Sequence, residues 1–507
     1  MQNLSLPAVP MAVRWPAQWL AWLPLLTAVA LAAPPVHAAE TRPGLSPCRL
    51  QGVEYEALCG SVRRPLDPAA PRGTMIDVHF AVLPALARNR KPDPVFFFAG
   101  GPGQSAVEIA GHVAGLLGRV SNRRDIVLVD QRGTGRSAPL VCDEPAPTQP
   151  LAEAVDAARL FDRLADCRTR LQQLPHGDLR HYTTALAMQD ADAVRRQLGA
   201  ERVNLVGGSY GTRAVLDFMR QFPRAVRRAV IDGVAPPDMV LPAAFSTDNQ
   251  AALDAVFSAC EAEQACRARY PALRADWRGL LATLPREVRV AHPVTGEVQG
   301  LTLGRDTLLG LVRTPLYVPA LASALPLALT EAARGRFEAL VGLATALQGG
   351  RPGGLAEGMH FSVVCAEDVP RLAQSTDRPG ADFGDAFAEL YRRVCKDWPR
   401  GAVPLEFYTL PPAPVATLVL SGGADPVTPP RHGERTAKAL GSKARHVVVP
   451  EAGHGVMSLA CLRDAVFRFL DAAGDDDALQ VDAECARAVP RPPAFVPVTA
   501  ATAEARE

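Results

Sequence analysis

Six short apolar runs constrain the fold more than any other feature of this sequence. They span residues 95–98, 126–129, 203–206, 229–231, 415–420 and 446–449. Because the runs are continuously apolar rather than alternating, they are typical of parallel strands covered on both faces. Helical patterns lie between them, as in residues 184–198, which end before Gly199. This alternation of strands and helices predicts an α/β protein with a mostly parallel, doubly wound sheet.

The chain divides into segments of different character. Residues 39–237 and 413–488 contain the apolar runs and form the two parts of the expected α/β core. Between them, residues 238–412 show few strand patterns and many helix-like segments rich in alanine and leucine. We therefore expect a largely helical lid inserted into the core. Residues 489–507 are rich in proline and small residues, which predicts a flexible tail.

The first 38 residues have the features of a cleaved export signal. Arg14 precedes an apolar stretch, and Val36-His37-Ala38 fits a signal-peptidase cleavage site. A membrane anchor is the alternative, but the stretch is shorter than the roughly 20 residues a spanning helix needs, and Pro24 interrupts it. We predict an exported protein, periplasmic or secreted, with no stable membrane span after cleavage.

The cysteines agree with export, and the charge balance limits the partners. The chain has 10 cysteines and lacks the C-x-x-C spacing of a zinc or redox pair. We expect disulfides between cysteines adjacent in sequence, because short loops cost the least entropy to close. With 54 basic and 53 acidic residues, the composition favours neither nucleic acid nor an anionic membrane as partner. The sequence does not indicate an oligomeric state.

The segment "LVGGSYGTR" (residues 205–213) provides a candidate nucleophile, Ser209. It follows an apolar run and precedes a helical pattern, which is the strand–turn–helix context of a nucleophile elbow. Side chains would obstruct so sharp a turn, and Gly207, Gly208 and Gly211 would remove that obstacle. An ordinary turn serine is the alternative for the pentapeptide taken alone.

A base and an orienting acid follow Ser209 in the chain order of a hydrolase triad. His454 lies between two glycines just after the last apolar run, and Asp425 directly follows the preceding run in "LVLSGGADPVTPP". A serine hydroxyl needs such a base to become nucleophilic. A surface-turn aspartate is the alternative for Asp425, and a metal site is disfavoured because the histidines lack ligand spacing.

Donors for an oxyanion are expected from "VFFFAGGPGQSA", which places Gly100-Gly101-Pro102-Gly103 directly after the first apolar run. Its glycines leave backbone N–H groups open toward a substrate carbonyl, and we assign the donors to Gly101 and Tyr210. A phosphate-binding loop is the alternative, but neither of its glycine patterns is present.

These motifs, in this order, resemble those of α/β-hydrolase fold serine peptidases. The set comprises "GGPG", "DQRGTGRSA", "GGSYGTR", "SGGADPVTPP" and "AGHGV". It is most similar to the exported branch related to proline iminopeptidases and tripeptidyl aminopeptidases, over roughly residues 45–485. The resemblance implies acyl-enzyme catalysis by Ser209, His454 and Asp425, without a cofactor. One departure is Ala99, where proline iminopeptidases usually have a histidine, which puts strict prolyl specificity in doubt.

Substrate recognition is less constrained by the sequence. An aminopeptidase needs a carboxylate for the substrate's amino terminus, and Glu367 and Asp368 in the lid are candidates, with a solvated acidic loop as the alternative. Asp130 and Arg132 suggest a structural ion pair or loop clasp, with substrate contact as the alternative. We predict an aminopeptidase acting on peptides; a carboxylesterase with the same triad, or a binding protein on an inactive hydrolase fold, are the rival functions.

Overall fold

The computed structural model describes residues 44–346 and 354–497. The predicted signal peptide, residues 1–38, lies outside the described residues, as do the last ten residues of the predicted tail. No helix in the described part of the chain is long and apolar enough to span a membrane.

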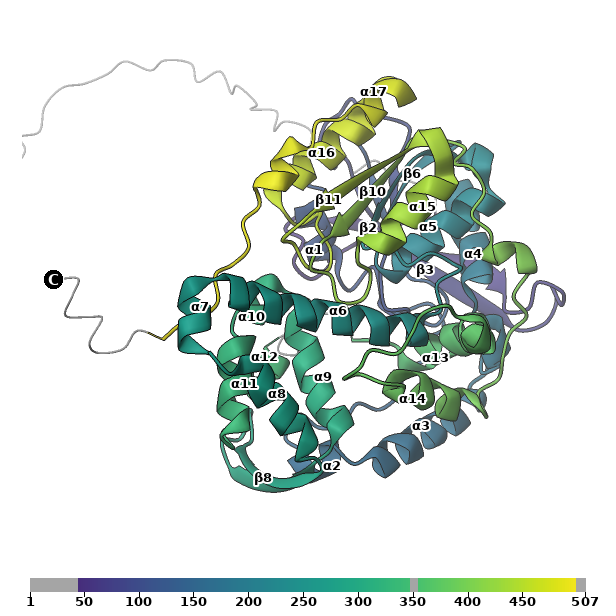
Figure 1. Ribbon diagram of the computed structural model, residues 1–507. Coiled ribbons are helices and arrows are strands. Elements are labelled where there is room, and N and C mark those ends of the chain that lie inside the picture. Colours follow the sequence, from purple (N-terminus) through teal and green to yellow (C-terminus); the bar gives the residue numbers. More distant parts are fainter. Residues whose placement is uncertain (1–43, 347–353, 498–507) are drawn as a thin grey trace, which may run out of the picture. The chain divides into compact units, whose positions relative to one another are not determined.

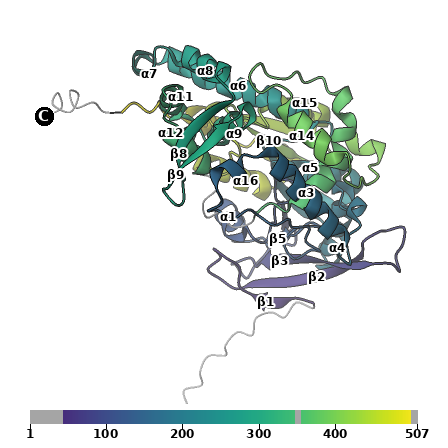
Figure 2. The ribbon, with the colours of Figure 1, turned by 90° about the horizontal axis from the view of Figure 1, so that it is seen from below.

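A nine-stranded mixed sheet forms the centre of the described chain (Figure 1). Its strands are β1 (Ser46–Cys48), β2 (Ala57–Pro65), β3 (Met75–Leu83), β4 (Val95–Phe98), β5 (Ile126–Val129), β6 (Val203–Gly208), β7 (Val226–Asp232), β10 (Thr417–Gly422) and β11 (Ala444–Val449), in the spatial order β1-β2-β3-β5-β4-β6-β7-β10-β11. Six neighbouring strands, in the spatial order β5-β4-β6-β7-β10-β11, pair in parallel. This confirms the predicted mostly parallel sheet. The pairs β1·β2, β2·β3 and β3·β5 are antiparallel, and β1, β2 and β3 form one edge (Figure 2).

Helices cover both faces of the sheet. They are α1 (Ala110–Leu116), α3 (Ala157–Gln172), α4 (Thr184–Gln197), α5 (Tyr210–Gln221), α15 (Pro430–Leu440), α16 (Ala460–Asp471) and α17 (Asp475–Leu479). The short helix α2 (Leu151–Ala154) packs instead against the segment between β7 and β10. Along β4, Phe96 and Phe98 pack into the cluster that includes α4 and α5, whereas Val95 and Phe97 pack into the cluster that includes α1 and α16. Successive side chains of a strand point to opposite faces, so a continuously apolar run satisfies both layers.

The segment between β7 and β10, which is called the lid below after the sequence-based prediction, is mostly helical. It holds α6 (Leu241–Ala262), α7 (Gln264–Arg269), α8 (Leu273–Ala282), α9 (Arg305–Leu316), α10 (Pro319–Ala322), α11 (Leu325–Ala333), α12 (Glu338–Thr345), α13 (Glu357–Glu367) and α14 (Ala386–Cys395). An antiparallel hairpin, β8 (Arg286–Ala291) and β9 (Val298–Leu303), interrupts the helices. Helices α6 to α12 have a hydrophobic cluster of their own. Short 3-10 helices lie at Leu179–His181, Pro223–Ala225, Val369–Gln374, Leu405–Tyr408, Gly441–Lys443 and Glu484–Ala488.

The described part of the predicted tail lies against this lid. The Phe495 N–H donates to the Ser323 carbonyl at 2.9 Å, and the Tyr270 hydroxyl donates to the Phe495 carbonyl at 2.7 Å. Up to Pro497, therefore, this stretch has fixed partners.

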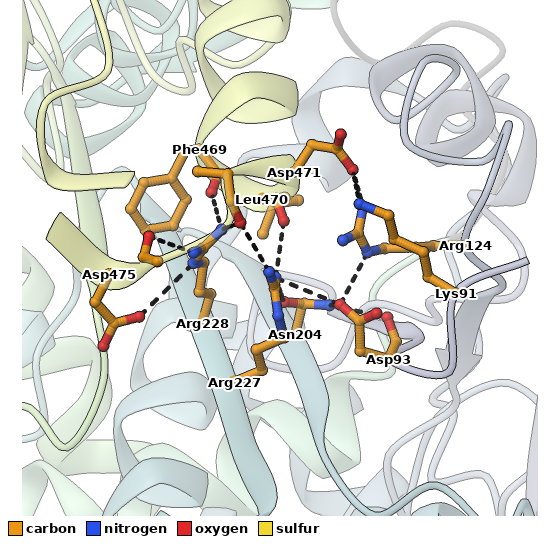
Figure 3. Close-up of polar contacts among 12 residues, drawn as sticks. Lys91, Asp93, Arg124, Asn204, Arg227, Arg228, Phe469, Leu470, Asp471 and Asp475 are labelled. Carbon is orange, nitrogen blue, oxygen red and sulfur yellow. Dashed lines mark hydrogen bonds and ion pairs between the residues drawn. The ribbon is translucent and has the colours of Figure 1, made fainter. Parts of the chain in front are cut away.

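A polar network secures the sheet at the amino ends of its parallel strands (Figure 3). Asn204 Nδ2 and Arg124 Nε both donate to Asp93 Oδ2, at 2.8 and 2.9 Å. Arg227 Nη1 donates to the Leu470 carbonyl at 2.8 Å, near the end of α16. The Arg227 guanidinium thereby satisfies a carbonyl of the last turn of α16 that would otherwise lack a partner. The carboxyl ends of the same strands are thereby left for the functional site.

Disulfides connect cysteines that are adjacent in sequence order, as predicted. The pairs are Cys48–Cys59, Cys142–Cys167, Cys260–Cys266, Cys365–Cys395 and Cys461–Cys485. This set is consistent with export to an oxidising compartment.

Candidate active site

Ser209 occupies a sharp turn between β6 and α5. Its backbone has φ 56° and ψ −126°, a conformation that non-glycine residues rarely adopt. A Cβ at Gly207 would lie 2.3 Å from the Gly211 carbonyl oxygen, and a Cβ at Gly211 would lie 2.1 Å from that of Phe98. These two glycines are required for the turn, as predicted. The same prediction is wrong for Gly208, where an added Cβ would meet nothing within 4 Å.

Asp425, which is buried, and His454, which is half-buried, form a hydrogen-bonded pair. His454 Nδ1 lies 2.8 Å from Asp425 Oδ2. An ionised carboxylate can only accept, so Nδ1 carries the proton and Nε2 is left free to take one. Asp425 also accepts from the Val427 and Thr428 N–H groups, each at 2.9 Å, and from the Thr428 hydroxyl at 2.7 Å. The carboxylate is thus fixed in position by its own loop.

The charges of this pair shift both pKa values. Burial alone would raise the pKa of Asp425, but the charge of His454 and the hydrogen bonds hold it below its ordinary value. Burial alone would lower the pKa of His454, but the charge of Asp425 and the hydrogen bond to it raise the pKa above 6.5. The imidazolium that would form during catalysis is therefore stabilised.

Two further groups position His454, and the sequence analysis did not single out either. Asp232, the last residue of β7, accepts from the N–H groups of Val456 and Met457, each at 2.8 Å. Mainly because it is buried, the pKa of Asp232 is raised to about 6. The Tyr317 carbonyl accepts from the His454 N–H at 3.0 Å, so the lid contacts the histidine loop directly. The end of an apolar run was the signal for Asp232, whereas nothing local marks Tyr317.

The two predicted oxyanion donors flank Ser209. Tyr210 is the first residue of α5, so its N–H has no partner within the helix. Gly101 has φ 111°, which favours glycine, and Gly100 lies so close that a Cβ there would be 3.2 Å from Ser209 Cβ. The glycine-rich loop after β4 therefore packs directly against the nucleophile.

A cavity of about 390 Å³ brings these groups together. Its lining includes Gly101, Ser209, Tyr210, His454 and Thr428 from the core, and Phe245, Arg313, Tyr317, His360 and Tyr391 from the lid. A nucleophile, a base and backbone donors facing one enclosed space are the components of acyl transfer. Among the described residues, no group of three or more histidine, cysteine, aspartate or glutamate side chains could hold a metal ion.

The structure places Glu367 and Asp368 outside this cavity. Both are buried, and both pair with Arg213, which lies four residues after Ser209; the shortest distances are 3.3 Å for Glu367 and 3.0 Å for Asp368. Glu367 also accepts from the Thr184 N–H at 2.7 Å, and Asp368 accepts from the Leu241 N–H at 3.1 Å. This placement corrects the expectation of substrate contact, because their carboxylates are committed to tying the lid to the nucleophile helix.

The predicted ion pair between Asp130 and Arg132 is also wrong. Arg132 Nε pairs with Asp190 Oδ2 at 2.7 Å, whereas Asp130 accepts from the Ser105 hydroxyl at 2.6 Å and the Val107 N–H at 3.1 Å. Each side chain is buried and joins separate segments, so the loop-clasp alternative describes both better.

The sequence model of the α/β-hydrolase fold matches residues 93–459. This chain belongs to the α/β-hydrolase fold family. The chain is 27% identical over 433 residues to the serine protease Hip1 of Mycobacterium tuberculosis. The alignment covers 78% of this chain and 82% of Hip1. It is 31% identical over 194 residues to a tripeptidyl aminopeptidase of Streptomyces lividans, covering 35% of each chain. A proline iminopeptidase structure from Mycobacterium smegmatis matches 83% of this chain and 100% of its own, with 15% identity and a TM-score of 0.35.

Proposed function

We propose that this α/β hydrolase is an exported serine peptidase that cleaves peptides carrying a free amino terminus. The observation that supports it best is the Asp425–His454 hydrogen bond of 2.8 Å, since His454 lines the same cavity as Ser209. A serine, a histidine oriented by a carboxylate, and open backbone N–H groups form the machinery of acyl transfer.

The proposed reaction has two halves, acylation and deacylation, and His454 acts first as base and then as acid in each half. Ser209 Oγ attacks the substrate carbonyl carbon while His454 Nε2 takes its proton, and the N–H groups of Gly101 and Tyr210 donate to the oxyanion. The imidazolium then protonates the leaving amine, and the C–N bond breaks to give an acyl-enzyme. Water then attacks the acyl carbon while His454 Nε2 takes its proton; the bond from that carbon to Ser209 Oγ breaks, and His454 returns the proton to Oγ, which releases the acid and restores Ser209.

We choose peptides as the substrate class because two related proteins are a serine protease and a tripeptidyl aminopeptidase. The proposed requirement for a free amino terminus rests on the similarity to the tripeptidyl aminopeptidase. A carboxylesterase is the second candidate, and one observation favours it. No Asp or Glu side chain is among the described residues lining the cavity, so an ammonium group would have only uncharged acceptors there.

The decisive experiment compares purified mature protein, with its disulfides formed, with the variant Ser209→Ala. Fluorogenic substrates carrying one, two or three residues, each with a free or a blocked amino terminus, are assayed beside a short-chain ester. Ser442→Ala, an exposed serine after α15, is the matched control. Free-amine peptides should be cleaved only when Ser209 is present, with a loss of several orders of magnitude in the variant.

Other outcomes would reassign the protein. Turnover of the ester without any peptide cleavage would make it an esterase. Cleavage of blocked peptides as fast as free ones would remove the aminopeptidase part of the proposal and leave a serine peptidase. Equal activity in Ser209→Ala would refute the assigned nucleophile.

A further inference from the structure

A lid arginine in the catalytic cavity has no acidic partner. Arg313, on α9, lines the same cavity as Ser209 and His454. The only hydrogen bond it makes with a described residue joins its Nη2 to the Tyr317 hydroxyl at 2.7 Å. Its Nε is buried and has no hydrogen-bond partner among the described residues. Of the described carboxylates, none lies within ion-pairing distance of it.

Aromatic rings hold this guanidinium in place. Its central carbon lies 5.4 Å from the centroid of Phe245, 5.4 Å from that of Tyr317 and 5.2 Å from that of Phe387. Cation–π contacts favour a guanidinium but leave its charge and remaining N–H donors unneutralised. The side chain is therefore oriented by its cage and still able to bind an anion.

The cavity is short of negative charge around Arg313. Asp425 is committed to His454 and Thr428, and Asp232 to the backbone of the histidine loop. By contrast, Arg213, a fully buried arginine near the nucleophile, has two carboxylates. Arg313 is half-buried with a buried Nε, and it has no such partner among the described residues, so its charge is left for a group that enters the cavity.

The same residue connects to the catalytic histidine through one side chain. Tyr317, which accepts from Arg313, packs its ring edge-on against the His454 imidazole, with 5.3 Å between centroids. A group bound to Arg313 would therefore lie on the lid side of the cavity that Ser209 and His454 also line.

We propose that Arg313 binds a carboxylate of the substrate, so that the enzyme prefers substrates bearing a negative charge near the cleaved bond. Guanidinium–carboxylate pairing is strong because both partners are charged and their geometries match. The carboxylate could be an acidic side chain on the acyl side or the free carboxyl terminus of a short peptide. This proposal rests on the proposed serine hydrolase function and specifies its substrate class.

The test uses substrates that differ only in a carboxylate. Glutaryl and glutaramyl 4-nitrophenyl esters form one pair, peptide amides cleaved after Glu or Gln form a second, and short peptides with free or amidated carboxyl termini form a third. Each pair is assayed on wild type, Arg313→Gln and Arg313→Lys. Arg305→Gln, on the exposed start of the same helix, is the matched control.

Wild type should show a kcat/KM about 10- to 100-fold higher for the charged member of at least one pair, as expected for a charge-assisted hydrogen bond. Arg313→Gln should bring that ratio close to one, Arg313→Lys should retain part of it, and Arg305→Gln should leave it unchanged. The pair that responds identifies the source of the carboxylate. Equal ratios in wild type and Arg313→Gln would overturn the proposal.

Two controls keep the result interpretable. If Arg313→Gln does not fold, calorimetric binding to Ser209→Ala of the Glu and Gln peptides, and of the peptides with free and amidated carboxyl termini, still decides; equal affinities within both pairs would overturn the proposal. Its failure is also distinct from failure of the peptidase function. Charge-selective ester cleavage without peptide cleavage would refute only the proposed peptidase function. Peptide cleavage without charge selectivity would refute only the proposed role of Arg313.

Discussion

Replacing Glu367 by glutamine should remove a pH-dependent penalty on stability. Glu367 is buried against Arg213 and Asp368, and two carboxylates there share one guanidinium. Mainly because of its burial, the pKa of Glu367 is raised from 4.5 to about 7. The folded protein therefore holds a proton at this site at pH values where the unfolded chain has lost it.

The magnitude follows from that shift. At about 1.4 kcal/mol per pH unit, raising the pKa of Glu367 from 4.5 to about 7 makes about 3 kcal/mol of stability pH-dependent. This stability is fully present below pH 4.5 and is lost as the pH rises through about 7. Glu367→Gln does not titrate, so its stability relative to wild type should rise by about 3 kcal/mol across this range.

Denaturant unfolding of the disulfide-intact protein, at several pH values between about 4.5 and 8, measures this difference. Other titrating groups cancel because both proteins contain them. Glu406→Gln, an exposed glutamate, is the matched control and should show a nearly constant difference from wild type. A pH-independent difference for Glu367→Gln would refute the reasoning. The variant should also keep any amino-terminal preference, because Glu367 lies outside the cavity.

Three further predictions concern the site itself. kcat/KM should fall as the pH drops through the raised pKa of His454, above 6.5, because only the neutral imidazole accepts a proton; a flat profile between about pH 5 and 8 would exclude His454 as the base. Gly100→Ala should lower kcat about tenfold or more with a smaller effect on stability, because its Cβ would lie 3.2 Å from Ser209 Cβ. Steady-state kinetics and a thermal melt separate the two effects, and an unchanged kcat would contradict the close packing of Gly100 against Ser209. Asp232→Ala should destabilise the protein by about 1–3 kcal/mol and reduce activity, because two buried N–H groups of the histidine loop lose their acceptor. Denaturant unfolding and steady-state kinetics at constant pH measure the two effects, and wild-type stability together with wild-type kcat/KM would refute the role assigned to Asp232.

Much of the fold and of the candidate triad could be predicted because their signals are local. Strand β4 begins and ends where the first apolar run does, at Val95–Phe98. The elbow at Ser209 needs small residues two positions before and two positions after it, and the sequence has Gly207 and Gly211 there. Asp425 and His454 each follow a strand, and parallel strands bring their carboxyl ends to one edge of the sheet.

The sequence by itself therefore predicted the six strands that pair in parallel, the turn at Ser209 and the chain order of the candidate triad, since each depends on neighbours in the chain; it did not predict β1, β2 or the hairpin β8–β9. Only the tertiary structure decided the partners of the charged groups. Glu367 and Asp368 meet Arg213 across 154 and 155 positions of sequence, which turns apparent substrate ligands into internal ties. Arg313 reaches the cavity from the lid without a carboxylate. Whether a charge is neutralised or left for a substrate depends on which distant segments pack beside it, because burial and pairing, not residue type, set its free energy.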